Sequence, residues 1–83
     1  MATFVHVVGG QGVGKSLLIV ALAAQHAARG RVCAGNDPEI FNSKREALKE
    51  RPDADVYFIE CCDDSELDAI PGELVIRMEK VPA

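Results

Sequence analysis

The 83-residue sequence contains no tryptophan, one tyrosine and three phenylalanines. It also lacks a basic excess: nine lysine and arginine residues against thirteen aspartate and glutamate residues give a formal net charge of −4. The basic residues form only one loose group, which comprises Lys44, Arg45, Lys49 and Arg51. Nucleic-acid-binding domains carry a clear basic stripe or patch. The composition therefore argues against nucleic acid as a partner.

Long apolar segments and paired-cysteine motifs are absent as well. The longest apolar run, Leu17 to Ala24, is much shorter than the roughly 20 residues that a membrane-spanning helix needs. The N-terminus has no basic segment of the kind that opens a signal peptide. Cys33, Cys61 and Cys62 form no CxxC motif, so we expect reduced, buried thiols. These absences predict a soluble cytoplasmic chain with no membrane partner.

The apolar pattern predicts a single domain over residues 1–83. Thr3–Val8 is an almost continuous β-branched apolar run, typical of a strand covered on both faces, and His6 within it is expected to be an ordinary strand histidine. Lys15–Ala28 is rich in leucine and alanine and is followed by Gly30, which predicts a helix that ends there. Because this helix is apolar on nearly all sides through Ala24, we expect it to be largely buried.

Four further elements are expected: a strand at 31–35, a helix at 43–50 that begins with the capping box Ser43 and Glu46, and strands at 55–60 and 73–81. In the last strand the face that carries Val75 and Arg77 is mixed, which indicates an edge strand. The link before it has about twelve residues, near the minimum for a parallel crossover, so an antiparallel last strand is an alternative. The predicted fold is α/β: a small, mostly parallel three-layer sheet of about four strands with two helices, in the order β-α-β-α-β-β.

The stretch Gly9–Ser16 reads GGQGVGKS and matches the pattern G-x-x-x-x-G-K-[ST]. Glycines let a loop turn its backbone N–H groups toward a phosphate, and the helix that follows aims its own N–H groups and dipole at the same anion. The Lys15 ammonium reaches the β- and γ-phosphates in such loops, and the Ser16 hydroxyl binds Mg²⁺. The expected nucleotide-binding residues are Gly9, Gly10, Gln11, Gly12, Val13, Gly14, Lys15, Ser16 and Leu17.

On these residues the sequence resembles the P-loop NTPase superfamily, with the clear resemblance spanning residues 3–30. The resemblance implies a parallel sheet between helices that binds a nucleoside triphosphate, such as ATP, together with Mg²⁺. No N-K-x-D element of the guanine-specific families is present. The chain is also weakly similar to the Zot-type phage assembly ATPases and the partition-type ATPases. The signature lysine of the partition-type ATPases would fall at Gly10.

The resemblance also implies a Walker B strand, for which Val56–Glu60 is the candidate. Glu60 stands where the family pattern has an aspartate, so it could bind the metal or activate the attacking water. Asp63 or Asp64 could instead supply the metal ligand, and a solvated acid at a strand end is the remaining interpretation. The candidate catalytic residues are therefore Lys15 and Glu60, and the candidate metal ligands are Ser16 and Glu60.

Two main hypotheses follow from the sequence. The first is a minimal ATP-binding protein that uses Mg²⁺ and hydrolyses ATP slowly. The second is a non-catalytic nucleotide- or phosphate-binding module that docks on a larger assembly of the phage or plasmid type. No arginine is placed as a finger, so a second copy of the chain or a larger partner protein is expected to complete the site if hydrolysis occurs.

Overall fold

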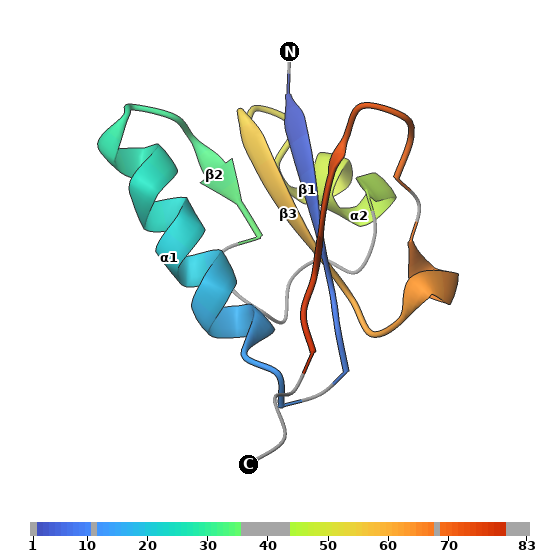
Figure 1. Ribbon diagram of the computed structural model, residues 1–83. Helices are drawn as coiled ribbons and strands as arrows, with labels where there is room; N and C mark the ends of the chain where they lie inside the picture. Colours follow the sequence, from blue (N-terminus) through green and yellow to red (C-terminus); the bar gives the residue numbers. More distant parts are fainter. Residues whose placement is uncertain (1, 11, 36–43, 68, 80–83) are drawn as a thin grey trace.

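The computed structural model describes residues 2–10, 12–35, 44–67 and 69–79 (Figure 1). Gln11 of the glycine-rich motif and Ser43 of the expected capping box lie outside the described residues. The elements are β1 (Thr3–Val8), α1 (Lys15–Ala28), β2 (Cys33–Ala34), α2 (Lys44–Glu50), β3 (Val56–Cys61), the 3₁₀-helix η1 (Asp64–Glu66) and β4 (Leu74–Arg77). The predicted bounds of β1 and α1 are confirmed, whereas β2 and β4 are shorter than expected and η1 was not anticipated.

The four strands form one sheet in the order β2-β3-β1-β4. Every pairing is parallel, including that of β4 with β1, in which Val5 lies opposite Leu74 and Val8 opposite Arg77. The antiparallel alternative for the last strand is therefore wrong, and its position at the edge of the sheet is confirmed. The link from β3 to β4 returns to the start of the sheet through η1 and Leu67, which packs against the core.

Alternating side chains of the strands divide the apolar core into two clusters, one on each face of the sheet. On one face Val5, Val7 and Phe58 pack against Ile19 and Ala23 of α1. On the other, Val8, Tyr57, Ile59 and Cys61 pack with Ala47 of α2. Figure 1 shows α1 and α2 on opposite sides of the sheet. The predicted three-layer α/β arrangement is thus confirmed, with a sheet that is parallel throughout.

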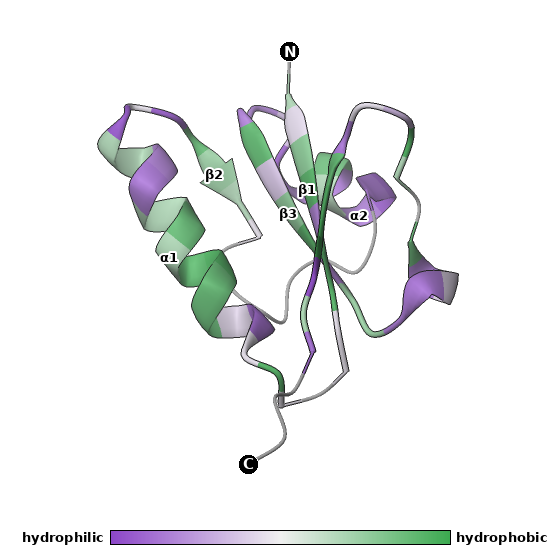
Figure 2. Ribbon diagram, in the orientation of Figure 1, coloured by the Kyte–Doolittle hydropathy of each residue, from purple (hydrophilic) through white to green (hydrophobic). Residues whose placement is uncertain are grey.

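The helix α1 is much more exposed than its apolar sequence predicts. Only Ile19 and Ala23 are buried, while Leu17 is 78% exposed and Val20 is 51% exposed. Figure 2 shows apolar residues along the turns of α1 nearest the glycine-rich loop. The expectation of a largely buried helix is wrong, because the sheet covers one side of α1 and no described element covers the other.

The cysteines only partly match the expectation of buried thiols. All three are free, and Cys61 is buried in the core, but Cys33 is half-buried and Cys62 is exposed. Cys62 is exposed because it follows the last residue of β3, where the chain leaves the sheet. Within the described ranges, no helix has the length and apolar character needed to cross a bilayer.

Tyr57, the single tyrosine, is fully buried in the middle of the sheet. Its ring stacks on Phe4, with ring centroids 4.8 Å apart and an interplanar angle of 12°. Its hydroxyl donates a hydrogen bond to the carbonyl of Arg51, just beyond α2. A buried tyrosine hydroxyl needs such a partner, and the bond fixes the chain between α2 and β3.

A buried polar network ties β4 to the rest of the fold. His6 is fully buried on β1, and its Nε2 donates to Oε2 of Glu73 at 2.8 Å. Lys44 at the start of α2 pairs with the other oxygen of Glu73 at 2.7 Å and lies 5.4 Å from the centre of the Phe4 ring. The Glu73 carboxylate therefore joins β1, α2 and the residue before β4.

The same contacts set the protonation of Glu73. Partial burial raises the pKa of this carboxyl, but hydrogen bonds from Lys44, His6 and the Ile70 N–H, together with the Lys44 charge, outweigh it and hold the pKa below its usual 4.5. A carboxyl whose pKa is lower in the folded state stabilises the fold above the unfolded-state pKa, and this contribution is lost as the pH falls through the folded-state pKa.

We predict that Glu73→Gln lowers the free energy of unfolding at pH 7 by about 1–2 kcal/mol, because the charge that holds Lys44 and His6 is removed. Urea titrations should also show that acidification below pH ~4.5 destabilises the wild type more steeply than the variant. Glu50→Gln, an exposed acid on α2, is the matched control. An equal pH dependence in wild type and Glu73→Gln would contradict the role given to this carboxylate.

Candidate functional site

The glycine-rich loop leaves β1 through a crowded position at Gly9. Its N–H donates to the Cys61 carbonyl at 3.0 Å, which continues the β1–β3 ladder by one residue. A Cβ at Gly9 would lie 2.8 Å from Cγ2 of Val13 and 2.9 Å from the carbonyl oxygen of Met78. The loop can therefore turn between Val13 and the end of β4 only because residue 9 has no side chain.

Two further glycines shape the loop where it enters α1. Gly12 and Gly14 have φ values of 80° and 93°, in the left-handed region that other residues rarely adopt. Gly14 is the N-cap of α1, with no side-chain capping bond, and the first helical turn contains no acidic residue. Among the described residues, no side chain therefore caps the first N–H groups of α1, at the positive end of its dipole.

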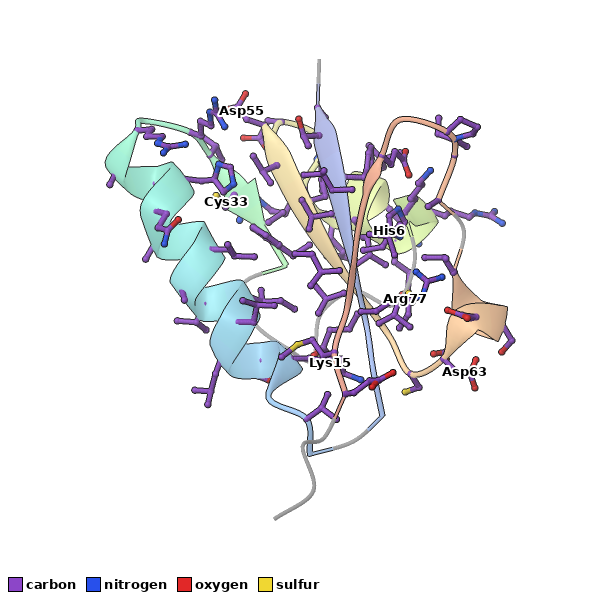
Figure 3. The ribbon with its side chains drawn as sticks, in the orientation of Figure 1. His6, Lys15, Cys33, Asp55, Asp63 and Arg77 are labelled. Atoms are coloured by element: carbon purple, nitrogen blue, oxygen red, sulfur yellow. The ribbon has the colours of Figure 1, made fainter. Side chains whose placement is uncertain are left out.

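The side chain of Lys15 folds back across this loop. Its Nζ donates to the carbonyl of Gly9 and lies 3.4 Å from the carbonyl of Cys61, so it bridges the ends of β1 and β3. Figure 3 shows Lys15 at the end of the sheet where the strands finish. The ammonium is partnered only by neutral carbonyl oxygens in these contacts, which an anion with full charge can outcompete.

Glu60, the penultimate residue of β3, lies on the same pocket as Lys15. The residues that line this pocket of about 460 Å³ are Gly12, Gly14, Lys15, Ser16, Glu60 and Cys62. Partial burial raises the pKa of the Glu60 carboxyl, and the Lys15 charge offsets part of that rise. The pocket therefore contains a cation, a hydroxyl, a carboxylate and the start of a helix.

The structure separates the other candidate acids from this pocket. Asp63 caps η1 by accepting from the Ser65 N–H at 2.9 Å, and hydrogen bonds from the Ser65 side chain and backbone lower its pKa. Asp64 pairs with Arg77 at 3.1 Å. Neither lines the pocket, so among Glu60, Asp63 and Asp64 only Glu60 lies beside Lys15 and Ser16.

Only some of the predicted nucleotide-binding residues line this pocket. Of these, Gly12, Gly14, Lys15 and Ser16 line the pocket, whereas the Leu17 side chain is turned to solvent and Val13 packs toward Gly9. Sequence reasoning did not single out Cys62 as a site residue. The sequence feature that could have identified Cys62 is its position two residues after Glu60, just past the end of β3.

A second pocket of about 340 Å³ lies at the opposite end of the sheet, lined by Thr3, Arg31, Asp55 and Val56. The Asp55 carboxylate accepts from the Val32 N–H at 2.9 Å, and Arg31 contacts Nδ1 of His26 at 3.1 Å. Both charged groups are thus engaged in local contacts. No described helix begins at this pocket, so we place the candidate site at the glycine-rich loop.

Comparisons of this chain with protein-family models, with curated proteins and with solved structures returned no match. The chemistry of the site is therefore argued from its own geometry.

We predict that Gly9→Ala lowers the free energy of unfolding by about 1–3 kcal/mol, because the added methyl meets the Met78 carbonyl and Val13 below contact distance. Gly10→Ala is the matched control, since a Cβ there meets nothing within 4 Å. Chemical denaturation of the two variants measures the difference. Equal stability of the two would show that the loop does not pass Met78 as closely as described.

Proposed function

We propose that this chain binds the phosphate groups of a nucleoside triphosphate, with ATP the first candidate, at the pocket between the glycine-rich loop and Glu60. The observation that carries the proposal is the convergence of Lys15, the uncapped start of α1 and the left-handed backbone at Gly12 and Gly14 on one pocket. Phosphate suits this arrangement because it accepts hydrogen bonds from N–H groups and from an ammonium simultaneously. The resemblance of Gly9–Ser16 to the P-loop motif supports the same ligand.

Binding would exchange the contacts of Lys15. In the described structure its ammonium donates to the Gly9 carbonyl, and Lys15 also lines the pocket. A phosphate oxygen carries more charge than a carbonyl oxygen, so the ammonium gains a charge-assisted hydrogen bond when it turns to the ligand. This exchange needs only rotation of the Lys15 side chain.

The residues present also fit Mg²⁺ as a companion of the nucleotide. Ser16 and Glu60 offer a hydroxyl and a carboxylate on the same pocket, and Mg²⁺ prefers oxygen ligands. Within the described residues no group of three or more His, Cys, Asp or Glu side chains could hold a metal alone. Mg²⁺ usually binds through one or two protein groups plus phosphates and water, where it neutralises phosphate charge, and this pattern suits Ser16 and Glu60.

Hydrolysis would depend on Glu60 and on groups that the pocket lacks. A carboxylate whose pKa is raised by burial is a better proton acceptor, which suits a role in orienting a water molecule. No arginine is among the described residues that line the pocket. This favours slow turnover by the isolated chain, and it keeps the non-catalytic binding module as the second candidate.

We predict that Lys15→Ala weakens ATP–Mg²⁺ binding about 10- to 150-fold, the cost of losing a charge-assisted hydrogen bond of about 1.5–3 kcal/mol. An amide NMR titration measures the affinity and locates the site. Shifts should concentrate at Gly12 to Leu17 and at Glu60. Lys49→Ala, which removes an exposed lysine from α2, is the control and should bind normally. Unchanged affinity in Lys15→Ala would rule out the proposed site.

A second prediction concerns the metal. Mg²⁺ should raise the affinity of the wild type for ATP, and Glu60→Gln should cut this gain about tenfold, because a ligand to the metal or to its bound water is lost. Glu50→Gln is the control for the change in net charge. Calorimetric titrations with and without Mg²⁺ provide the comparison, and an unaltered gain in Glu60→Gln would remove Glu60 from the metal site.

Phosphate release distinguishes the two candidate functions. ATP turnover by the wild type that is lost in both Lys15→Ala and Glu60→Gln would identify the chain as an ATPase. Tight triphosphate binding without turnover would identify the binding module.

A further inference from the structure

Met78, the residue that follows β4, connects the edge of the sheet to the glycine-rich loop. Its N–H donates to the carbonyl of Val8 at 2.8 Å, which continues the β1–β4 pairing past Arg77. This bond holds residue 78 beside the point where the chain leaves β1 and enters the loop. Figure 1 shows the chain after β4 running toward the start of α1.

The contacts of Met78 span the loop from its first glycine to its last. A Cβ at Gly9 would lie 2.9 Å from the carbonyl oxygen of Met78 and 3.4 Å from its Cβ. A Cβ at Gly14 would lie 3.9 Å from Cε of Met78, an ordinary van der Waals separation. The terminal methyl of Met78 therefore lies beside the left-handed Gly14, on the side where another residue would carry its side chain.

The same side chain also belongs to the apolar core. Met78 packs against the cluster of buried residues that α1 covers, and so does Ile76, two residues earlier on the same face of the strand. Methionine is unbranched and has three rotatable bonds, so it can fill an irregular gap between two surfaces. Met78 therefore joins this core cluster to the loop.

Met78 acts on residues of the site rather than on a ligand. It is not among the described residues that line the pocket, whereas Gly14 lines the pocket and is the N-cap of α1. The position of Gly14 sets where the first N–H groups of α1 point. Binding groups hold their geometry only when the residues behind them are packed. Loss of the Met78 methyl would leave a cavity beside Gly14 into which the loop can shift.

We propose that Met78 is a positioning residue for the phosphate-binding loop. Its methyl supports the backbone of Gly14, while its carbonyl and Cβ support the backbone of Gly9. The inference rests on the proposed function, because it concerns the affinity of that pocket for ATP–Mg²⁺. It makes the geometry of the site depend on the end of β4, a strand with no residue among the described ones that line the pocket.

We predict that Met78→Ala weakens ATP–Mg²⁺ binding about tenfold, because small displacements of binding groups are costly. Calorimetric titration measures the affinity. Met78→Val keeps an apolar side chain on the core cluster but is too short to reach Gly14, so it should lose affinity similarly at a smaller cost in stability. Met78→Leu, of nearly the same volume as the wild type, should regain most of the affinity.

Ile76→Ala is the matched control, because Ile76 packs on the same cluster but lies opposite Val7, within the sheet. It should lower the free energy of unfolding and leave the affinity unchanged. A wild type that binds ATP–Mg²⁺ no better than Met78→Val would overturn the role of Met78 and leave the nucleotide site standing. An equal loss of affinity in Ile76→Ala would also overturn it, since a weakened strand would then explain the effect. A wild type that does not bind ATP–Mg²⁺ would instead remove the proposed function, and this inference with it.

The Met78 methyl group provides a direct spectroscopic test. The chain has two methionines, Met1 and Met78, so Met78→Leu assigns their methyl signals in an NMR spectrum of protein labelled at the methionine methyl carbon. Because this methyl lies beside Gly14, its signal should shift when ATP–Mg²⁺ is added, although Met78 is not among the described pocket residues. A Met78 signal that is unmoved at saturation, while the Gly14 amide shifts, would contradict the support of Gly14 by Met78.

Discussion

The close passage of the backbone at Gly9 between Val13 and Met78 is the constraint on which the rest of the site depends. It brings together the end of β1, the loop and the residue after β4 within contact distance. The Gly9 N–H also extends the ladder to Cys61, which sets the distance between β1 and β3 at their carboxyl ends. Lys15 spans that distance to reach both carbonyls. A side chain at residue 9 would shift all of these positions at once.

The fold separates two polar centres with different roles. At the carboxyl ends of β1 and β3, Lys15 and Glu60 line an open pocket, where their charges are accessible to a ligand. On the face of the sheet that α2 covers, the Glu73 carboxylate binds both His6 and Lys44 and so holds β4 in place. Because Met78 follows β4 and contacts the loop, the second centre supports the first through the strand between them.

The sequence predicted the elements whose signals are local. β1 and α1 have the expected bounds because a β-branched run, a glycine-rich turn and the stop at Gly30 lie within a few residues of the structure they specify. Gly14, Lys15 and Ser16 lie at the predicted start of α1 for the same reason. Glu60 lies on the same pocket as Lys15 because a residue near the end of β3 lies beside the loop that follows the neighbouring strand β1.

The features that depend on distant residues were not predictable in this way. The direction of β4 follows from its pairing with β1, and the ion pair of Glu73 with Lys44 joins segments far apart in the chain. The exposure of α1 depends on how few elements surround it, which an apolar sequence alone does not reveal. Asp63 and Asp64 are candidate metal ligands in the sequence, yet in the folded chain Asp63 accepts from its neighbour Ser65 and Asp64 pairs with Arg77 of β4.

The burial of Tyr57 makes the chain its own optical reporter. With no tryptophan present, this one tyrosine dominates the near-ultraviolet emission, and no brighter residue accepts its excitation energy. The ring stacks on Phe4 in the centre of the sheet, and its hydroxyl is bonded to the chain just after α2. A change in its fluorescence therefore reports the loss of contacts between β1, β3 and the chain just after α2. Unfolding of the chain can thus be followed, with or without a ligand at the glycine-rich loop, and no added label or engineered chromophore is needed.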